Sequence, residues 1–460
     1  MSTGLKVQIE MDKGEQLATD LRAHLEGVDV FGGSDDPGVD FGPWNIAEAQ
    51  RPLARIECRT AGQVSTALKI AADHDVPVSV CGGREDAFAR NSRAGFLVVD
   101  LRHMDNVIYD AVTRVARIGG GVTTSRLLSR LSSDIVTPTT CNANVGLIGA
   151  ATGGGYGLLA GSYGLVCDAL LGVEMVLANG QQVSVDATHE PDLFWALRGG
   201  GNGFGVVTSA RLATYSCPHV LSTQINFPLS SGRRPLMIIQ DLLDEEPDRL
   251  GLTPVFAKVD DGPAILSLQF AWNGLEEEGR AVLKVLSDLP GAQMANVGLV
   301  PFRETLDRGE LWPWGKVWGA RTRSLGRLDG AVVDTCLEGA ETMPSLGARL
   351  FLHDFHGYAS RVPLSETAFA LREDHYVAAA CGMSEPSDRD GEEIMRKWLD
   401  KVAGSLEKSA MPGGYVNFLA PSDTERVERF YGHAAERLRA IKLQVDPHDR
   451  FRSATARLRP

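Results

Sequence analysis

The sequence predicts an α+β fold, and three patterns support that prediction. Strand-like runs alternate with long amphipathic helices between residues 218 and 410, which is typical of an antiparallel sheet covered by helices on one face. Asn179 and Gly180 separate two apolar runs and predict a β-hairpin over 169–185. Nearer the N-terminus, short apolar strands repeatedly end at glycine turns. At 460 residues the chain is long enough for two or three domains.

The first predicted unit is a small β-α-β-β arrangement. Thr60 and Gln63 have the spacing of a capping box, in which the threonine oxygen accepts a free backbone N–H at the start of a helix. Apolar residues at helical spacing then continue to His74. Residues 1–30 are expected to be a leader with a short helix, followed by a turn-rich stretch at 31–43. The strands of the unit are expected at 54–59, 76–80 and 96–101.

Two further regions follow along the chain. The second unit contains a strand at 115–122 that ends in a glycine turn, a segment of almost only small residues at 138–164, and the hairpin. The third region has the α+β pattern, and a charged helix is expected in the tail, 422–460. In the third region we expect strands at 253–259, 264–272, 348–355 and 376–383, and helices at 276–289 and 391–408.

Composition and charge exclude several classes of function. The net charge of −13 argues against a nucleic-acid partner, because phosphate binding requires a basic surface. The seven cysteines are scattered, odd in number and without a CxxC pair, so neither a zinc site nor a disulfide framework is expected. This cysteine usage favours a reducing compartment, and we expect a cytoplasmic protein. The N-terminus lacks the apolar core of a secretory signal, and no run is long enough for a membrane span.

Glycine is unusually dense in three loops, at 119–121, 153–157 and 199–205. Each glycine weakens a helix or strand, so this density favours access of a ligand to the backbone, where bare N–H groups can line up on a phosphate chain. Tight turns are the alternative explanation. The chain has neither GxGxxG after a strand nor GxxxxGK[ST], which excludes a Rossmann site and a P-loop and indicates a dinucleotide site of another design.

Several motifs together resemble one known family. They include "VPVSVCGG", "TPTTCNANVGLIGAATGGGYG", "PDLFWALRGGGNGFGVVT", "YVNFL" and "DPHDRF", and they extend over nearly the whole chain from about residue 45. This pattern is similar to that of the berberine-bridge-enzyme-like, FAD-linked oxidases of the vanillyl-alcohol-oxidase superfamily. The resemblance implies a two-lobed FAD-binding domain of the PCMH type with an inserted substrate domain. The expected ranges are a leader (1–45), the FAD domain (46–215), the substrate domain (216–412), whose antiparallel sheet is covered by helices, and a segment that returns to the FAD domain (413–460).

The resemblance also implies where FAD binds. In the family a histidine after two glycines bonds to the flavin 8-methyl carbon, but here Glu85 occupies that position and Arg84 replaces the second glycine. We therefore expect no histidyl link and FAD held without a covalent bond. A thiolate link from Cys141 to flavin C6 stays open as an alternative, although Cys141 lies four residues before Val145, one more than is usual. The cofactor-binding residues implied are Cys81, Gly82, Gly83, Arg84, Glu85, Asp86, Thr139, Thr140, Cys141, Val145, Gly146, Gly149, Gly153, Gly154, Gly155, Gly157, Gly205, Val206, Val207 and Asn417.

Oxidation by flavin transfers a hydride and usually requires a base. Tyr415 and Asn417 are two residues apart on an expected strand at 413–419, which places them on one face. In the family the tyrosine of this pair often acts as the base, and we predict that role for Tyr415, with a half-buried structural aromatic as the alternative. Residues 453–456 lack the Asn-x-Asn that the family usually has near the isoalloxazine ring.

Other candidates outside these motifs are ambiguous. His353 and His356 are three apart on an expected strand and face opposite sides, so they cannot share a metal ion, and one satisfied and one exposed histidine is the expected outcome. Trp312, Trp314 and Trp318 could line an apolar pocket or pack in the core.

Two functions follow as hypotheses. The first is an FAD-dependent oxidase or dehydrogenase that acts on a small organic alcohol or amine, such as a tailoring step of secondary metabolism. The second is a redox-silent cyclase or isomerase that keeps FAD as a structural element, which the departures at Glu85 and 453–456 motivate.

Overall fold

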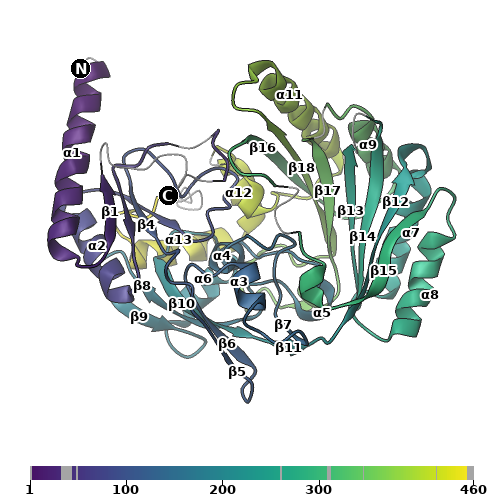
Figure 1. The fold of residues 1–460 in the computed structure, drawn as a ribbon, viewed down its shortest axis with the longest axis horizontal. Coiled ribbons are helices and arrows are strands. Elements are labelled where there is room, and N and C mark those ends of the chain that lie inside the picture. Colours follow the sequence, from purple (N-terminus) through teal and green to yellow (C-terminus); the bar gives the residue numbers. More distant parts are fainter. Residues whose placement is uncertain are drawn as a thin grey trace.

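This computed structural model describes residues 3–32, 44–47, 50–258, 262–307, 312–344, 347–420 and 422–452, with backbone alone for 3–11 (Figure 1). Residues 33–43 of the turn-rich stretch and residues 453–456 lie outside the described residues. Within those ranges, none of the helices combines the length and the apolar character that a bilayer span requires. The fold class is α+β, as predicted.

The first lobe is built on a four-stranded sheet. The capping box is confirmed at the start of α2 (Ala61–Asp73): the Gln63 backbone N–H donates to Thr60 Oγ1 at 3.2 Å, and the Thr60 N–H donates to Gln63 Oε1 at 3.1 Å. The expected short N-terminal helix is longer than predicted, because α1 covers Thr3–His24. The strand order is β1 (Asp29–Gly32), β2 (Ala54–Glu57), β4 (Leu97–Asp100) and β3 (Val78–Cys81).

The second lobe contains a five-stranded antiparallel sheet. The predicted hairpin is confirmed, and Gly180 in its turn has φ +80°, a value that favours glycine. Four short helices lie beside the sheet, and sequence reasoning missed two of them, α4 (Leu147–Thr152) and α5 (Ala160–Tyr163). The others are α3 (Thr124–Leu128) and α6 (Pro191–Leu197). The strand order is β5 (Val107–Asp110), β6 (Val115–Gly119), β10 (Val206–Ala213), β8 (Leu170–Val176) and β9 (Gln182–Val185), and β7 (Ile135–Val136) pairs separately with β11 (Tyr215–Ser216).

A seven-stranded antiparallel sheet forms the third part of the fold. One face is covered by α7 (Arg233–Glu245), α8 (Glu276–Ser287), α9 (Gly330–Glu341) and α11 (Arg389–Leu406), and the other face is turned toward the two lobes (Figure 1). Alternation along β17 follows this division, since Leu350 and Leu352 pack with the helices whereas Phe351 lies on the opposite face. The strand order is β15 (Gln293–Val300), β12 (Val220–Pro228), β14 (Ala264–Trp272), β13 (Leu250–Lys258), β17 (Arg349–Phe355), β18 (His375–Ser384) and β16 (Val317–Leu325).

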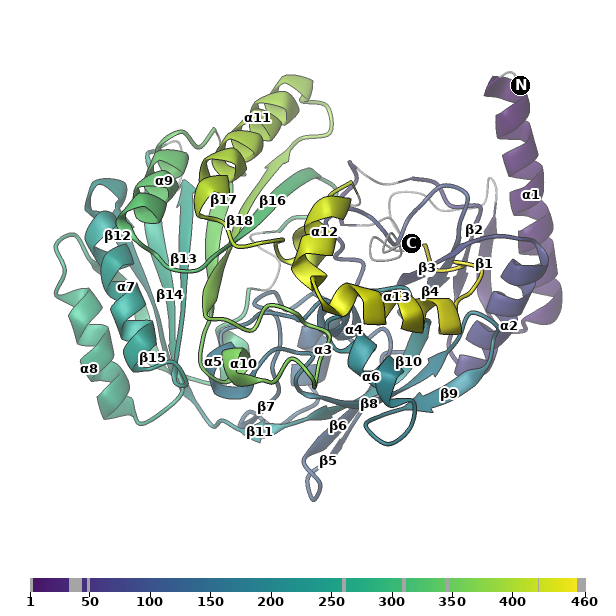
Figure 2. The same cartoon turned by 180° about the vertical axis from the view of Figure 1, so that it is seen from behind.

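The C-terminal segment returns to the lobes (Figure 2). It forms two helices, α12 (Thr424–Tyr431) and α13 (Ala434–Val445), and α13 packs beside α6. Beyond α13, the Arg450 carbonyl accepts a hydrogen bond from the Val78 N–H at 2.8 Å, which fastens the tail to β3. The strand predicted over 413–419 is wrong: Val416–Phe418 is a single 3₁₀ turn. A small helix, α10 (Tyr358–Arg361), packs against α5.

Candidate active site

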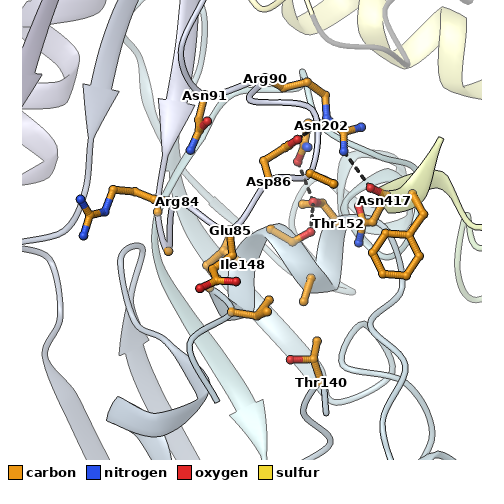
Figure 3. A pocket seen from close by; sticks show the side chains of 18 of the residues that line it. Arg84, Glu85, Asp86, Arg90, Asn91, Thr140, Ile148, Thr152, Asn202 and Asn417 are labelled. Atoms are coloured by element: carbon orange, nitrogen blue, oxygen red, sulfur yellow. Dashed lines mark hydrogen bonds and ion pairs between the residues drawn. The ribbon is translucent and has the colours of Figure 1, made fainter. Parts of the chain in front are cut away.

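A large cavity lies where the two lobes, the seven-stranded sheet and the C-terminal segment meet (Figure 3). The loop after β3, the start of α4 and the loop before β10 supply its lobe side. Most of the residues predicted from the sequence converge on it, although they come from four separate stretches of chain. Those that line the cavity are Gly82, Gly83, Arg84, Glu85, Asp86, Thr140, Cys141, Val145, Gly146, Gly149, Gly205, Val207, Tyr415 and Asn417.

The remaining predicted residues lie behind the cavity wall. A Cβ on Gly154 would lie 2.8 Å from the Phe369 ring, and one on Gly157 would lie 1.8 Å from the Thr139 carbonyl oxygen. Close packing of the protein on itself therefore accounts for glycine at these two positions, rather than access of a ligand to the backbone. The residues outside the cavity lining are Cys81, Thr139, Gly153, Gly154, Gly155, Gly157 and Val206.

The glycines that do line the cavity leave backbone exposed to it. The loop after β3 touches the start of α4, and a Cβ on Gly83 would lie 2.4 Å from the Gly146 nitrogen. Gly149 is exposed, and a Cβ there would meet no atom of the described chain within 4 Å, so it faces the open cavity. The N–H groups of Gly83 and Glu85 donate no hydrogen bond to a described residue. This cradle, which side chains would fill, fits the phosphate chain of FAD.

Arg84 replaces the second glycine of the family's motif, and its backbone conformation is strained. Its φ of +65° lies in the left-handed region, which costs a non-glycine residue about 1–2 kcal/mol. Its guanidinium lies 4.8 Å from the centroid of the Trp314 ring and is directed away from Glu85 (Figure 3). The side chain therefore leaves the carboxylate of Glu85 without a direct ion pair.

Glu85 is a carboxyl group with few partners. Asn142 Nδ2 donates to its Oε2 at 3.3 Å, whereas Oε1 is buried and has no hydrogen-bond partner among the described residues. Burial, followed by the nearby carboxylate of Asp307, raises the pKa of Glu85 to about 7. Glu85 therefore keeps its proton at a higher pH than an ordinary carboxyl group does.

The loop after β3 is tied to the C-terminal segment. Arg90 Nε donates to Asp86 Oδ2 at 2.8 Å, and an Arg90 terminal nitrogen donates to the Asn417 carbonyl oxygen at 2.9 Å (Figure 3). Beside these residues, Thr152 Oγ1 donates to Asn202 Oδ1 at 2.6 Å (Figure 3). Arg90, Thr152 and Asn202 also line the cavity. Thr152 and Asn202 lie within quoted motifs but were not singled out, and Arg90 lies outside every quoted motif.

Tyr415 lies at the cavity end of a buried hydrogen-bond network. Its phenolic oxygen accepts hydrogen bonds from the Gly155 N–H at 3.2 Å and from Asn417 Nδ2 at 2.9 Å. Burial raises the pKa of Tyr415 to about 12. The ring of Tyr156 packs edge-on against it at 4.7 Å, and the Tyr156 hydroxyl and His375 Nε2 share a hydrogen bond of 2.9 Å. Tyr415 is thus a neutral phenol whose oxygen already accepts two hydrogen bonds.

Cys141 lines the cavity as a thiol. Burial, followed by the carboxylate of Asp354, raises the pKa of the Cys141 thiol to about 12. The thiolate is the nucleophilic form of cysteine, and this environment disfavours it.

The seven-stranded sheet supplies the opposite wall of the cavity. Trp312 and Trp318 line it, whereas Trp314 is exposed and its ring makes a cation–π contact with the guanidinium of Arg84. His353 lines the cavity, whereas His356 follows the end of β17 and is buried against Tyr376. The expected pair of one satisfied and one exposed histidine is wrong, because neither ring makes a hydrogen bond to a described residue and neither is exposed. Alternation in "RLFLHDF" was the available signal for the position of His353. Sheet and loop residues that sequence reasoning did not place in the cavity are Trp44, Gln269, Phe351, His353 and Cys381.

Comparisons with known proteins agree with this site. Residues 52–186 match the family described as "FAD binding domain", and residues 414–456 match "Berberine and berberine like". The chain is 27% identical over 433 residues to the FAD-linked oxidoreductase aurO of Gibberella zeae, covering 91% of this chain and 83% of the relative. It is 33% identical over 255 residues to (R)-6-hydroxynicotine oxidase of Paenarthrobacter nicotinovorans, covering 54% of this chain and 55% of the relative. The solved glucooligosaccharide oxidase of Acremonium strictum, with 6-S-cysteinyl, 8α-N1-histidyl FAD, has a TM-score of 0.80 at 22% identity, covering 95% of this chain and 97% of the other.

Proposed function

Because the chain belongs to the berberine-bridge-enzyme-like FAD-linked oxidoreductases, we propose that it binds FAD in the large cavity without a covalent bond and oxidises a small alcohol or amine there. The single observation that carries the proposal is the convergence of the glycine cradle, Glu85 and Tyr415 on one cavity. The enzyme is an FAD-dependent oxidoreductase that acts on a small organic molecule.

Each side of the cavity has a distinct part in this function. The loop after β3 and the first turn of α4 hold the phosphate chain with backbone N–H groups, which need no positive charge. FAD, when bound, accepts a hydride from the carbon that is oxidised. Tyr415 presents its phenol to the reacting group, while the Gly155 N–H and the Asn417 amide hold the phenolic oxygen in place. The sheet closes the cavity on the substrate side and excludes water.

The chemistry of two side chains favours the proposal that the flavin is bound without a covalent bond. Glu85 stands where related enzymes have the linking histidine, and a carboxyl group does not form the same stable bond to the 8-methyl carbon. Cys141 is held as a thiol by its surroundings, whereas attack on the flavin ring requires the thiolate. The relatives are named as oxidoreductases and oxidases, which favours redox chemistry over the redox-silent alternative.

The test is an absorbance spectrum of the purified holoenzyme, repeated on the pellet and supernatant after acid precipitation. A yellow supernatant supports non-covalent FAD. A yellow pellet contradicts it, and loss of that colour in Cys141→Ser would then assign the bond to the cysteine. Anaerobic incubation with a panel of alcohols and amines tests the reaction, because a substrate must bleach the flavin absorbance. Turnover of a substrate without any bleaching would support the redox-silent alternative instead.

A further inference from the structure

A short segment near the N-terminus, residues 44–46, joins the loop after β3 to the seven-stranded sheet. The Trp44 N–H donates to the Arg84 carbonyl oxygen at 3.1 Å, in the loop after β3. The Ile46 N–H donates to the Lys316 carbonyl oxygen at 3.2 Å, directly before β16. The segment therefore bonds through its backbone to the lobe side of the cavity and to the sheet side.

Asn45 makes the same connection with its side chain. Its Nδ2 donates to the Ala87 carbonyl oxygen at 2.5 Å and to the Trp318 carbonyl oxygen at 3.0 Å, and its Oδ1 accepts from the Trp318 N–H at 3.0 Å. Asn45 is completely buried. Because a buried polar group that loses its partner is costly, these bonds oppose separation of the loop from β16.

The ring of Trp44 packs on the sheet side. It stacks on Trp318, with ring centroids 4.6 Å apart and planes 24° apart, and it lies 5.9 Å from the Trp312 ring. Its Nε1 also donates to the Trp312 carbonyl oxygen at 3.0 Å. All three tryptophans line the cavity, so the segment forms part of the cavity wall as well as connecting its two sides.

Arg84 adds a contact from the loop to the same part of the sheet side. Its guanidinium carbon lies 4.8 Å from the centroid of the Trp314 ring, and the side chain is directed away from Glu85 (Figure 3). The glycine that the family's motif has at this position would adopt φ +65° without strain, but it has no side chain to make the contact. Arginine therefore combines a strained backbone with an additional attraction between the loop and the sheet side.

We propose that residues 44–46, Arg84 and Trp314 form a clasp that retains FAD in the cavity in place of a covalent bond. This inference rests on the proposed function, in which FAD is bound without such a bond. The loop after β3 is part of the cradle for the phosphate chain. The clasp fixes this loop against the sheet side, so it lowers the frequency of the local opening that releases the cofactor. Asn45 is thus a positioning residue, since it acts on FAD through the loop.

The test measures how fast FAD leaves the holoenzyme. The holoenzyme is mixed with an excess of 5-deaza-FAD, which prevents rebinding, and released FAD is separated by filtration at timed intervals. Arg84→Met keeps a long side chain on the same strained backbone but removes the cation, and Trp314→Leu removes the ring. Each should speed release about 2- to 10-fold, the range of one cation–π contact. The double variant should be no faster than the faster single variant, because both substitutions remove one shared contact.

A near-isosteric substitution tests the other part of the clasp. Asn45→Asp keeps the acceptor oxygen for the Trp318 N–H but loses the donor to the Ala87 and Trp318 carbonyl oxygens, so it should also speed release. Arg249→Met is the control, because Arg249 lies 6.0 Å from the ring of Trp272 on the helix-covered face of the sheet. Its release rate should equal that of the wild type. If Asn45→Asp does not fold, the substitutions of Arg84 and Trp314 decide the question alone.

Several outcomes would overturn the proposal. Release at the wild-type rate from Arg84→Met and Trp314→Leu would remove the clasp and leave non-covalent binding of FAD intact. Rate increases that multiply in the double variant would show that the two side chains act separately. An equal increase in Arg249→Met would indicate general destabilisation. A wild-type flavin that stays in the acid-precipitated pellet would defeat the proposed non-covalent binding and the clasp together, because a covalent bond would then retain FAD.

Discussion

The side-chain amide of Asn417 donates a hydrogen bond to the phenolic oxygen of Tyr415 at 2.9 Å, across a single 3₁₀ turn. The Gly155 N–H donates to the same oxygen at 3.2 Å. Two donors on one oxygen leave the hydroxyl proton to point elsewhere, and they also stabilise the phenolate against the effect of burial. The two donors would thus stabilise the phenolate that the predicted role of Tyr415 as a general base requires.

Tyr415→Phe should lower the rate of flavin reduction by the substrate about 10²- to 10⁴-fold, the usual size of a general acid–base contribution. The flavin content should stay unchanged, since phenylalanine preserves the ring packing against Tyr156. Anaerobic stopped-flow reduction and the ratio of flavin to protein absorbance measure the two quantities. Tyr431→Phe is the control, because Tyr431 is also buried but bonds the Gly199 carbonyl away from the cavity and should keep full activity. Full activity of Tyr415→Phe would rule out the catalytic role.

Glu85→Gln should stabilise the apoprotein at pH 8 relative to the wild type and have little effect at pH 4. The pKa of Glu85 is raised to about 7 in the folded state from an ordinary value near 4.5, so the unfolded chain loses its proton first as the pH rises. The folded state then holds more protons than the unfolded state, and stability falls between these two pH values. Glutamine cannot titrate, so the difference in melting temperature between variant and wild type should grow across this window.

An exposed carboxylate gives the control for Glu85. Glu278 is paired with Arg249 at the surface, and Glu278→Gln should show no comparable growth of the difference between pH 4 and pH 8. Because other groups titrate in both proteins, only the difference between variant and wild type is informative. A difference for Glu85→Gln that is constant with pH would mean that this carboxyl group is not perturbed.

Local rules predicted much of the fold. The Thr60 capping box and the Gly180 hairpin each depend on a few neighbouring residues, so the sequence contains the whole signal. The helices α4 and α5 could not be predicted within 138–164, because a segment of small residues has no hydrophobic periodicity. The strand predicted around Tyr415 failed because its alternation arises from a turn packed between the lobes and the sheet.

The cavity could be predicted only in part. The lobe side follows from motifs, and Glu85 was noticed because it interrupts one of them. The sheet side has no motif: Gln269 and Phe351 reach the cavity through sheet pairing between distant strands, which no local pattern encodes. The pairing of Arg90 with Asn417 is equally non-local, since 327 residues separate the two.

Gly149→Ala should weaken FAD binding without destabilising the fold. The added methyl group meets no described protein atom within 4 Å and would occupy the cavity beside the cradle, while alanine itself favours the helix. Gly404→Ala in α11 is the matched control, because its Cβ also meets no atom within 4 Å but faces solvent on an exposed helix. Reconstitution of apoprotein with FAD, followed by flavin fluorescence, measures the affinity. Unchanged affinity in Gly149→Ala would mean that the cofactor does not approach this turn.

The last prediction concerns a buried ion pair between the segment that joins α5 to β8 and the segment that joins α10 to β18. Arg372 donates to both carboxylate oxygens of Asp168, at 2.7 and 3.0 Å, and the two side chains are only 5% and 2% exposed. Arg372→Met should lower the free energy of unfolding by about 3–5 kcal/mol, because it leaves an uncompensated carboxylate in the interior. The matched surface pair is Arg361 with Asp248, each 55% exposed, and Arg361→Met should cost no more than about 1 kcal/mol.

A second substitution separates loss of attraction from burial of a lone charge. If the cost of Arg372→Met comes from the stranded carboxylate, then adding Asp168→Leu should recover much of the lost stability, since a buried pair is replaced by apolar contacts. Urea unfolding of the wild type, the two single variants and the double variant, followed by circular dichroism, gives the comparison. A double variant less stable than Arg372→Met alone would show instead that Asp168 is needed for its own hydrogen bond, the 2.8 Å contact from the Leu165 N–H, independently of the arginine.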